Sequence, residues 1–270
     1  MVSHEGLTYG GLVVSRDATL TDVLQSIHAC LRYLHDEGIS RLLYKRIPSF
    51  YNTVPDDEVG YALFLLEAHL CRRDCALVVN RADRLRFRKG RKSEISKARR
   101  FGVRVVQEPG FEAFWEKVLV PRLESRYGVK PVHSIEEITL LASRFPENIR
   151  QFSAYRGDEI VAGTTIYETH GVAHAQYIAV TDEGQKIGAL DFLFGWLIEE
   201  HYPGKTHFDL GICNEKGGRV LNQGLLDWKE GLGGRCYTHD FYEVLTAHHT
   251  KLESVLSDSP DNDAKGPQAK

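Results

Sequence analysis

The chain has 270 residues, of which 42% are hydrophobic, and its formal net charge at pH 7 is -3. This length and composition can bury a substantial core, which excludes disorder for most of the chain. A net charge this close to zero does not by itself favour binding to nucleic acid or to an anionic membrane surface. No apolar run approaches the roughly 20 residues that cross a bilayer, and the first residues lack a signal-peptide pattern. Its five cysteines form no disulfide or metal framework, so we expect a cytoplasmic protein with reduced thiols and no metal.

The first part of the chain alternates strands and helices, as α/β architecture does. The periodicity of apolar residues and the positions of glycine and proline predict a strand, a helix, a strand, a helix and a strand, over residues 6–15, 19–38, 41–48, 55–73 and 75–80. The second helix would carry Cys71, with only His69 nearby as a further metal ligand, which argues against a metal site.

A strongly basic segment follows over residues 81–104, with eleven lysines and arginines. Two interpretations stay open: a solvated helix face, or a charge field for anionic ligands such as nucleotide phosphates. Nucleic acid is disfavoured, because aromatic residues are not interleaved in the way that base stacking needs.

The second part of the chain is predicted to begin with helices and to continue into a run of strands. Helices are expected over residues 111–128, 134–146, 190–198 and 221–229. Strands are expected over residues 152–156, 160–169, 172–180, 206–212 and 240–245. The tail over residues 251–270 is polar and is expected to be disordered.

A polar loop with two glycines joins the strand 172–180 to the helix 190–198. Gly184 and Gly188 would let the backbone approach an anion, and Lys186 could add a positive charge. The N-terminus of a helix offers unpaired N–H groups and the positive end of its dipole, which suits a pyrophosphate. A plain strand-to-helix turn would need the same residues, so the loop alone leaves both interpretations open.

This strand, loop and helix resemble motif A of the GNAT superfamily of acyl-CoA N-acyltransferases, whose loop is written Q/R-x-x-G-x-G/A. Gln185 and Gly188 match the first two fixed positions, whereas Leu190 stands at the third and the small Ala189 falls one place early. A longer resemblance, from about Ser3 to Glu243, is to the FemAB-like or BioF2-like branch. It rests on stretches such as "SHEGLTYGGL", "VAHAQYIAV" and "FDLGICNEKGGRVLNQGLLDWKEGLGGR".

The resemblance implies an α/β (α+β) GNAT fold, with a mixed, mostly antiparallel sheet flanked by helices. It implies two GNAT-like halves, a degenerate one over residues 1–108 and a catalytic domain over 109–250. The implied activity transfers a short acyl group from acyl-CoA to the amine of an amino sugar, nucleotide-linked, in polysaccharide or lipopolysaccharide biosynthesis. Such folds are often homodimers. Two alternatives remain: a Fem-type aminoacyl transferase of cell-wall synthesis, and a non-enzymatic GNAT-like binding module.

The same resemblance implies where acyl-CoA would bind. Backbone groups of the strand would pair with the pantetheine amides at Ile178, Ala179 and Val180. Backbone amides of the loop would hold the pyrophosphate at Gln185, Lys186, Ile187, Gly188 and Ala189.

Three residues are candidates for catalysis. His174 could take the proton of the attacking ammonium, as histidine often does in catalysis, or it could be a structural histidine. Gln176 lies two residues further, on the same strand face, and is expected to contact substrate. Asp209 lies among apolar residues, where a carboxylate must be paired or near a site. Glu168 ends a hairpin strand and could be a base or simply exposed.

The remaining candidates are expected to bind substrate. His4, Glu5 and Tyr9 stand beside three glycines, which suggests a backbone brought close to a ligand, although a frayed N-terminus would look the same. Amide and charged side chains after the strand 206–212 suit sugar hydroxyls or phosphates, and loops are also polar for ordinary reasons. These residues are Asn214, Glu215 and Asn222. Lys229 is assigned to the site by the resemblance alone.

Overall fold

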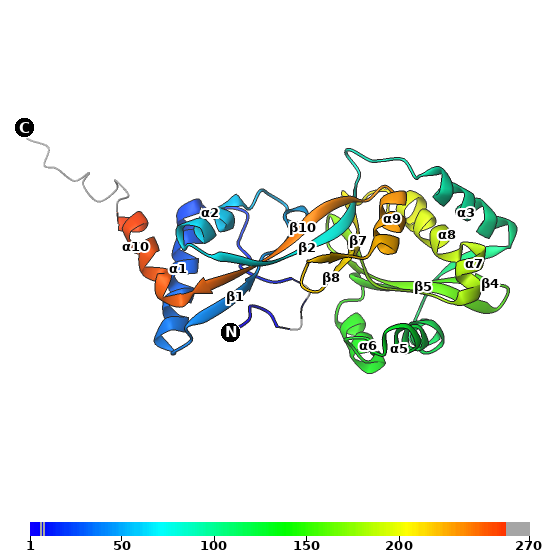
Figure 1. Ribbon diagram of the computed structural model, residues 1–270, viewed down its shortest axis with the longest axis horizontal. Coiled ribbons are helices and arrows are strands. Elements are labelled where there is room, and N and C mark those ends of the chain that lie inside the picture. The colour runs from blue at the N-terminus through cyan, green and yellow to red at the C-terminus, as the bar shows by residue number, and fades with distance from the viewer. Residues whose placement is uncertain (6, 8, 258–270) are drawn as a thin grey trace, which may run out of the picture. The chain divides into compact units, whose positions relative to one another are not determined.

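The computed structural model describes residues 1–5, 7 and 9–257 (Figure 1). Its described residues form two compact units, one of residues 1–74 and 238–257 and the other of residues 75–237. Strands β2 (His69–Asn80) and β10 (Arg235–Leu245) each contribute residues to both units. The boundary at residue 108 that the sequence suggested therefore lies inside the second unit. Within the described residues, no helix has the length and apolarity needed to cross a bilayer.

Unit 1 packs helices against a small group of strands in the order β1-β10-β2. Strand β1 (Arg41–Lys45) is antiparallel to β10, from Arg41 opposite Leu245 to Lys45 opposite Phe241. Its helices are α1 (Leu20–Asp36), η1 (Ser49–Tyr51), α2 (Asp57–Leu65), η4 (Thr246–His249) and α10 (Thr250–Ser257). A capping box between Thr19 and Asp22 begins α1. The core of this unit includes Leu24, Leu31, Leu63, Val244 and Leu252.

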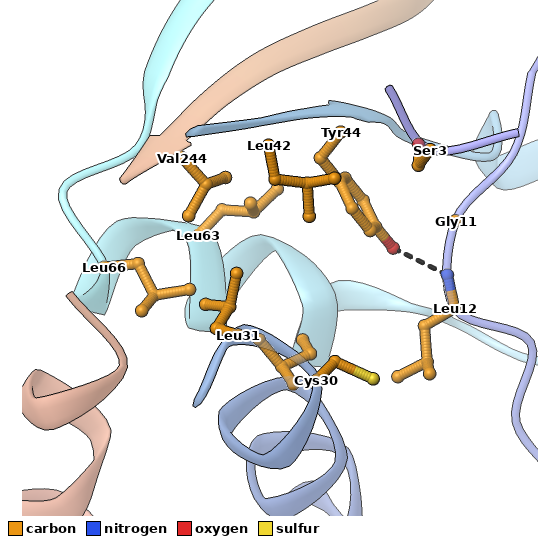
Figure 2. Close-up of a pocket in the computed structure, with 11 residues that line it drawn as sticks. Ser3, Gly11, Leu12, Cys30, Leu31, Leu42, Tyr44, Leu63, Leu66 and Val244 are labelled. Atoms are coloured by element: carbon orange, nitrogen blue, oxygen red, sulfur yellow. Dashed lines mark hydrogen bonds between the residues drawn. The ribbon is translucent and has the colours of Figure 1, made fainter. Parts of the chain in front are cut away.

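An apolar cavity of about 180 Å³ lies in unit 1, beside β1 and α1 (Figure 2). Leu31, Leu42 and Leu66 line it, and the thiol of Cys30 lies at its wall. The hydroxyl of Tyr44 accepts a hydrogen bond from the backbone N–H of Leu12 at 2.9 Å, which satisfies the polar end of this ring.

Three predictions for unit 1 are corrected by the structure. The helix expected over 55–73 ends at Leu65, because Glu67 has a positive φ of 50° and the chain then enters β2. Cys71 therefore lies on a strand. Residues 7 and 9–15, expected to be extended, form no strand, and residues 6 and 8 of that prediction lie outside the described residues.

The third correction concerns the tail, which was expected to be disordered from residue 251. Residues 250–257 instead form α10, because Leu252 is buried and Val255 and Leu256 pack against the core of unit 1. The rest of the predicted tail, residues 258–270, lies outside the described residues.

Unit 2 is built on strands in the order β2-β7-β6-β5-β4-β3. The new strands are β3 (Val103–Glu108), β4 (Ile149–Arg156), β5 (Glu159–Glu168), β6 (Val172–Val180) and β7 (His207–Ile212). Each pair is antiparallel except β6 and β7, which are parallel. The predicted class, a mixed and mostly antiparallel sheet flanked by helices, is confirmed.

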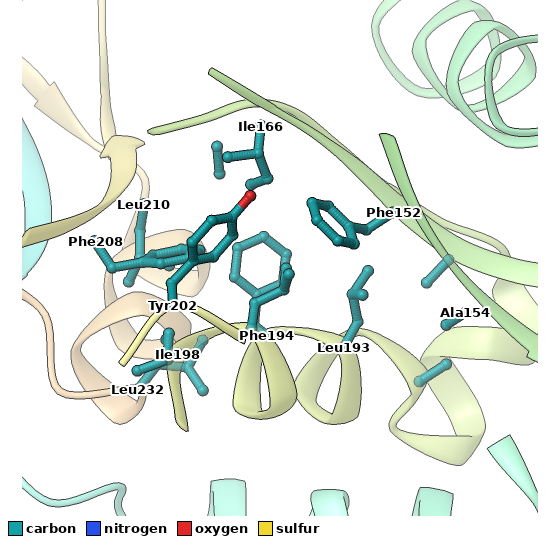
Figure 3. Close-up of a cluster of buried hydrophobic side chains, with 14 of the residues drawn as sticks. Phe152, Ala154, Ile166, Leu193, Phe194, Ile198, Tyr202, Phe208, Leu210 and Leu232 are labelled. Atoms are coloured by element: carbon teal, nitrogen blue, oxygen red, sulfur yellow. The ribbon is translucent and has the colours of Figure 1, made fainter. Parts of the chain in front are cut away.

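Helices cover both faces of these strands (Figure 1). One face carries α3 (Lys89–Arg100), α7 (Asp182–Ile187), α8 (Ala189–Trp196), the π-helix η3 (Leu197–His201) and α9 (Gln223–Gly231). The other carries α4 (Glu112–Phe114), the π-helix η2 (Trp115–Leu119), α5 (Val120–Tyr127) and α6 (Ile135–Arg144). On the first face, Phe194 of α8 packs edge-on against Phe208 of β7, with ring centroids 6.0 Å apart (Figure 3).

A β-bulge in β6 decides which side chains face each core. Thr165 of β5 lies opposite Tyr177, but the next residue, Ile166, lies opposite Ala175, so Gln176 is the extra residue. Before the bulge Ala175 packs into the core under α8, and after it Ile178 packs there. Tyr177 instead joins the core under α5 and α6.

Gly184, one of the two glycines of the predicted phosphate loop, gives a test of how closely α7 packs on β5. A Cβ at Gly184 would lie 2.1 Å from the carbonyl oxygen of Val161 on β5, whereas a Cβ at Gly90 in α3 would meet nothing within 4 Å. We expect Gly184→Ala to lower the free energy of unfolding by about 1–3 kcal/mol through overpacking. Gly90→Ala should leave it unchanged or raise it by up to about 1 kcal/mol, since alanine favours helix. Urea unfolding of both variants measures this, and a Gly184→Ala protein as stable as the parent would contradict the close packing of α7 on β5.

Candidate active site

Strands β6 and β7 pair over only three residues and then separate. The parallel register runs from Val172 opposite His207 to His174 opposite Asp209. Beyond His174, the pairing described for β6 is with β5 alone, up to Val180 opposite Ala162. Residues 175–180 of β6 therefore have one strand edge without a strand partner among the described residues.

The separation has a local cause in β7. Ala76 of β2 lies opposite Ile212, but Val78 lies opposite Asp209, so two residues of β7 oppose the single Leu77. One of these two is Gly211, whose φ of 78° is a left-handed conformation that glycine adopts without strain. Such a bulge bends the strand that carries it, and here it falls directly after Asp209.

His174 and Asp209 form a buried pair at the last paired position. The Nδ1 atom of His174 is 2.8 Å from Oδ2 of Asp209, and the exposed fractions of the two residues are 6% and 0%. The other carboxylate oxygen of Asp209 accepts the N–H of Gly211 at 2.7 Å. Hydrogen bonds to both oxygens favour the charged carboxylate, which would hold a proton on Nδ1 and leave Nε2 for chemistry.

Gln176 contacts that second nitrogen of His174. Its Oε1 lies 2.9 Å from Nε2. When His174 is neutral with its proton on Nδ1, Nε2 needs a hydrogen-bond donor. When the ring is an imidazolium, Nε2 carries a proton and needs an acceptor. The amide of Gln176 can present its NH₂ group or its oxygen to Nε2 by rotating about its last side-chain bond. Gln176 can therefore accompany a change in the protonation of His174.

Lys229 lies beside this pair on α9 and is almost completely buried. Its Nζ donates to the carbonyls of Gly211 at 3.0 Å and of Ile212 at 2.7 Å, the two residues at which β7 has left β6. Burial lowers the pKa of Lys229 from 10.5 to about 8, although the nearby Asp209 acts to raise it. The lysine thus supplies hydrogen bonds to the bent strand and can lose its proton near neutral pH.

Two tyrosines near His174 were missed by the sequence analysis. Tyr167 of β5 lies directly opposite His174, and its hydroxyl is buried with no hydrogen-bond partner among the described residues. Burial raises its pKa, so the phenol stays protonated. Tyr177 approaches Nδ1 of His133 at 2.6 Å, and burial raises its pKa as well. The sequence contains no direct signal for Tyr167, because its pairing with His174 depends on the bulge at Gln176.

The structure gives Glu168 a set of cationic partners. Its carboxylate accepts the hydroxyl of Tyr202 at 2.7 Å and forms ion pairs with Arg150 at 2.8 Å and Lys205 at 3.2 Å. These partners occupy both carboxylate oxygens, which supports a structural role for Glu168 rather than that of a base.

The polar residues after β7 are used in local structure. Asn214 and Glu215 form the short strand β8 (Asn214–Glu215), which pairs with β9 (Val220–Leu221). The side chain of Asn214 accepts the N–H of Cys75, and Asn222 caps α9 by accepting the N–H of Leu225 at 3.1 Å. Asn222 also donates to Glu215 at 3.0 Å.

His4, Glu5 and Tyr9 lie in unit 1. His4 has a positive φ of 51°, and its Nδ1 accepts the N–H of Gly11 at 3.1 Å. A Cβ at Gly10 would lie 2.5 Å from His4, so glycine is needed for this close approach. The ring of Tyr9 packs on Tyr51 with centroids 4.5 Å apart, and Glu5 is exposed.

The predicted phosphate loop is helical. Thr181 caps α7 by accepting the N–H of Gly184 at 3.0 Å, and Gln185, Lys186 and Ile187 lie within this helix. Gly188 ends it with a φ of 77° and packs on α3, where a Cβ would lie 2.6 Å from the carbonyl oxygen of Glu94.

Acidic groups stand at the start of α8, where the pyrophosphate was expected. Ala189 is fully buried there, and the carboxylate of Glu94 lies close to Gly188. Asp191, in the first turn of α8, is buried and pairs with Arg91 at 2.8 Å. Burial raises the pKa of Asp191, against the effect of Arg91. The positive end of this helix dipole is thus already matched by carboxylates of the chain.

Much of the basic segment is paired within unit 2. Six of its eleven cations bond to carboxylates or backbone carbonyls: Arg81, Arg84, Arg88, Arg91, Lys97 and Arg104. Arg81, for example, donates to the carbonyl of Tyr202 at 3.1 Å, and Arg88 pairs with Glu230 at 2.6 Å. Part of the charge of this segment is matched within unit 2, because carboxylates pair with Arg84, Arg88, Arg91 and Lys97.

Comparison with known proteins identifies the fold. No family model and no curated protein matches the chain. Among solved structures, FemX is 11% identical, with a TM-score of 0.61 over 89% of this chain and 82% of that one. The C-terminal domain of a putative lysylphosphatidylglycerol synthetase from Agrobacterium fabrum is 12% identical, with a TM-score of 0.56 over 84% and 75%. The L-PGS of Bacillus licheniformis is 14% identical, with a TM-score of 0.52 over 87% and 77%. The chain shares its fold with these proteins.

The buried Lys229 predicts a specific dependence of stability on pH. Because its pKa is about 8 in the folded chain and 10.5 when exposed, the unfolded chain binds more protons between these values. The free energy of unfolding should therefore rise through this interval, by on the order of 3 kcal/mol. Urea unfolding at about pH 7 and about pH 10 measures the rise. It should disappear in Lys229→Met and persist in Lys186→Met, which removes an exposed lysine. An equal rise in all three proteins would mean that Lys229 keeps its ordinary pKa.

Proposed function

We propose that this protein is an acyl-CoA-dependent N-acyltransferase whose acceptor is the amine of a nucleotide-linked amino sugar. The observation that carries the proposal is the open edge of β6 over residues 175–180, which begins at the buried pair of His174 and Asp209. The sequence resemblance to the GNAT superfamily supports the donor, and the resemblance to its FemAB-like branch supports the sugar acceptor.

The open edge suits the pantetheine arm of an acyl-CoA. That arm is extended and carries two amides, so it can add to a strand edge as a peptide does in β-augmentation. Backbone groups of Ile178 to Val180 provide the partners, since the described pairing leaves them bonded to β5 on one side only. Binding along β6 would direct the thioester toward His174.

The residues around His174 can carry the proton transfers of amide formation. Nε2 of His174 takes a proton from the acceptor ammonium, and the charged Asp209 stabilises the imidazolium that forms. The neutral amine then attacks the thioester carbonyl, the C–N bond forms and the C–S bond breaks. Tyr167, whose buried hydroxyl has no hydrogen-bond partner among the described residues, is a donor for the oxyanion or the leaving thiolate.

A second candidate is Fem-type aminoacyl transfer, in which the donor is an aminoacyl ester of tRNA. The observation that favours it is the pair of carboxylates, Glu94 and Asp191, at the start of α8, where a CoA pyrophosphate would meet negative charge. The shared fold with FemX is consistent with this donor. The same histidine chemistry would serve either ester or thioester.

Calorimetric titration with CoA and acetyl-CoA, followed by turnover assays, distinguishes the two candidates. Saturable binding of CoA and acylation of an amino-sugar nucleotide would support the proposal. Absence of CoA binding, together with transfer from aminoacyl-tRNA, would replace it with the second candidate. Binding of CoA without turnover on any amine would indicate a binding module.

His174 gives the sharpest mutational test. His174→Gln, which keeps a polar partner for Asp209, should lower kcat by roughly 10²- to 10⁴-fold, as expected for loss of a general base. The donor affinity should be unchanged, because the backbone of β6 is intact. His170→Ala removes an exposed histidine from the same hairpin and should retain the parent rate. Steady-state kinetics of the parent, His174→Gln and His170→Ala proteins measure this effect. A parent-like kcat in His174→Gln would remove His174 from the mechanism.

A further inference from the structure

A second polar cluster lies in unit 1. It consists of His28 on α1, His249 at the end of η4 and Glu253 on α10. Nε2 of His28 is 3.1 Å from Oε1 of Glu253, and Nδ1 of His249 is 3.6 Å from the same oxygen. One ligand atom from each residue lies within 4.8 Å of the other two.

The packing of unit 1 holds these three side chains together. His249 and Glu253 are four residues apart, so they lie on one side of a helical turn. His28 faces them from α1, between the buried Leu24 and Leu31, and Leu252 buries itself in the same core. Apolar contacts of the neighbouring residues thus hold the helices that carry the three side chains in place.

His249 lacks a hydrogen bond that its burial requires. Only 8% of the residue is exposed, and its Nδ1 has no hydrogen-bond partner among the described residues. The oxygen of Glu253, at 3.6 Å, is beyond hydrogen-bonding distance. Buried polar atoms of folded proteins almost always have a partner, so a group that accepts this lone pair is expected.

We propose that His28, His249 and Glu253 bind a divalent transition-metal ion of the Zn²⁺ type. Zinc–nitrogen and zinc–oxygen bonds of about 2.0 Å place neighbouring ligands of a tetrahedral ion about 3.3 Å apart. The separations of 3.1 Å and 3.6 Å fall on either side of that value. Two imidazoles and one carboxylate suit zinc rather than Mg²⁺ or Ca²⁺, which prefer oxygen ligands.

The ion would join the C-terminal helix to α1. His28 and Glu253 are 225 residues apart in sequence, so a common ligand closes a long loop. The sequence predicted no metal, because the cysteines and the neighbourhood of Cys71 offer too few ligands and no short motif unites residues so distant. His35, with its ring 5.6 Å from that of His249, lies next to the site.

Titration of the chelator-treated full chain with Zn²⁺, in competition with a chromophoric chelator, tests the proposal. We expect one tight equivalent in the parent protein. Glu253→Gln and His28→Asn should each weaken it by at least the roughly 10- to 100-fold that loss of a second-shell partner costs. His170→Ala should bind as the parent does, and excess Mg²⁺ should not compete.

A second measurement keeps the test valid if a histidine variant does not fold. Glu253 is 53% exposed, so Glu253→Gln should fold, and Zn²⁺ should raise the Tm of the parent more than that of this variant. Co²⁺ in the parent should show the visible absorption of a tetrahedral ion. No tight equivalent in the parent, or equal binding and equal Tm shifts in parent and Glu253→Gln, would overturn the site.

Discussion

The bend of β7 at Gly211 is the constraint on which the candidate active site depends. Because Gly211 takes a left-handed conformation in a bulge, β7 leaves β6 directly after Asp209. This separation opens one edge of β6, and it makes His174 and Asp209 the last paired position of the two strands. A residue with a Cβ would be strained at this φ, so the bulge requires glycine whatever the surrounding space.

Beyond the bend, the backbone carbonyls of β7 are no longer paired with β6, and Lys229 donates hydrogen bonds to two of them. Carbonyls that leave a strand pair must find other donors, and the ammonium of Lys229 bonds to those of Gly211 and Ile212. Burying an ammonium costs free energy, which appears as the lowered pKa of this side chain. The carbonyls of the bent strand stabilise the charged form of Lys229, and burial destabilises it. With a pKa of about 8, this side chain can change its protonation near neutral pH.

Sequence periodicity predicted most of unit 2 and much less of the detail around its site. The strand-like segments within 152–180 and the apolar stripe of 190–198 predicted strands and a helix correctly, because helices on both faces of the sheet bury these strands and the stripe of the helix packs against them. The loop 181–188 proved to be helical, and its cue was Thr181 followed by Asp182 and Glu183, a capping residue before two acids. The bulges at Gln176 and Gly211 were not predictable, since each depends on register with a neighbouring strand. The placement of Tyr167 opposite His174 depends on the first bulge, and the bonds of Lys229 to Gly211 and Ile212 lie at the second.

The two candidate donors differ in what they require of the start of α8. A CoA pyrophosphate bound there would approach Glu94 and the buried Asp191, so it would need either protonation of an acid or displacement of α3. The raised pKa of Asp191 eases the first route, and the ion pair with Arg91 opposes it. Arg91 could alternatively turn from Asp191 toward a phosphate, since its guanidinium is always charged and suits phosphate as well as carboxylate. An aminoacyl ester has no pyrophosphate, so this donor does not require an anion to be bound at the start of α8. The carboxylates at the start of α8 therefore bear on the choice between acyl-CoA and an aminoacyl ester, whereas the fold is compatible with both.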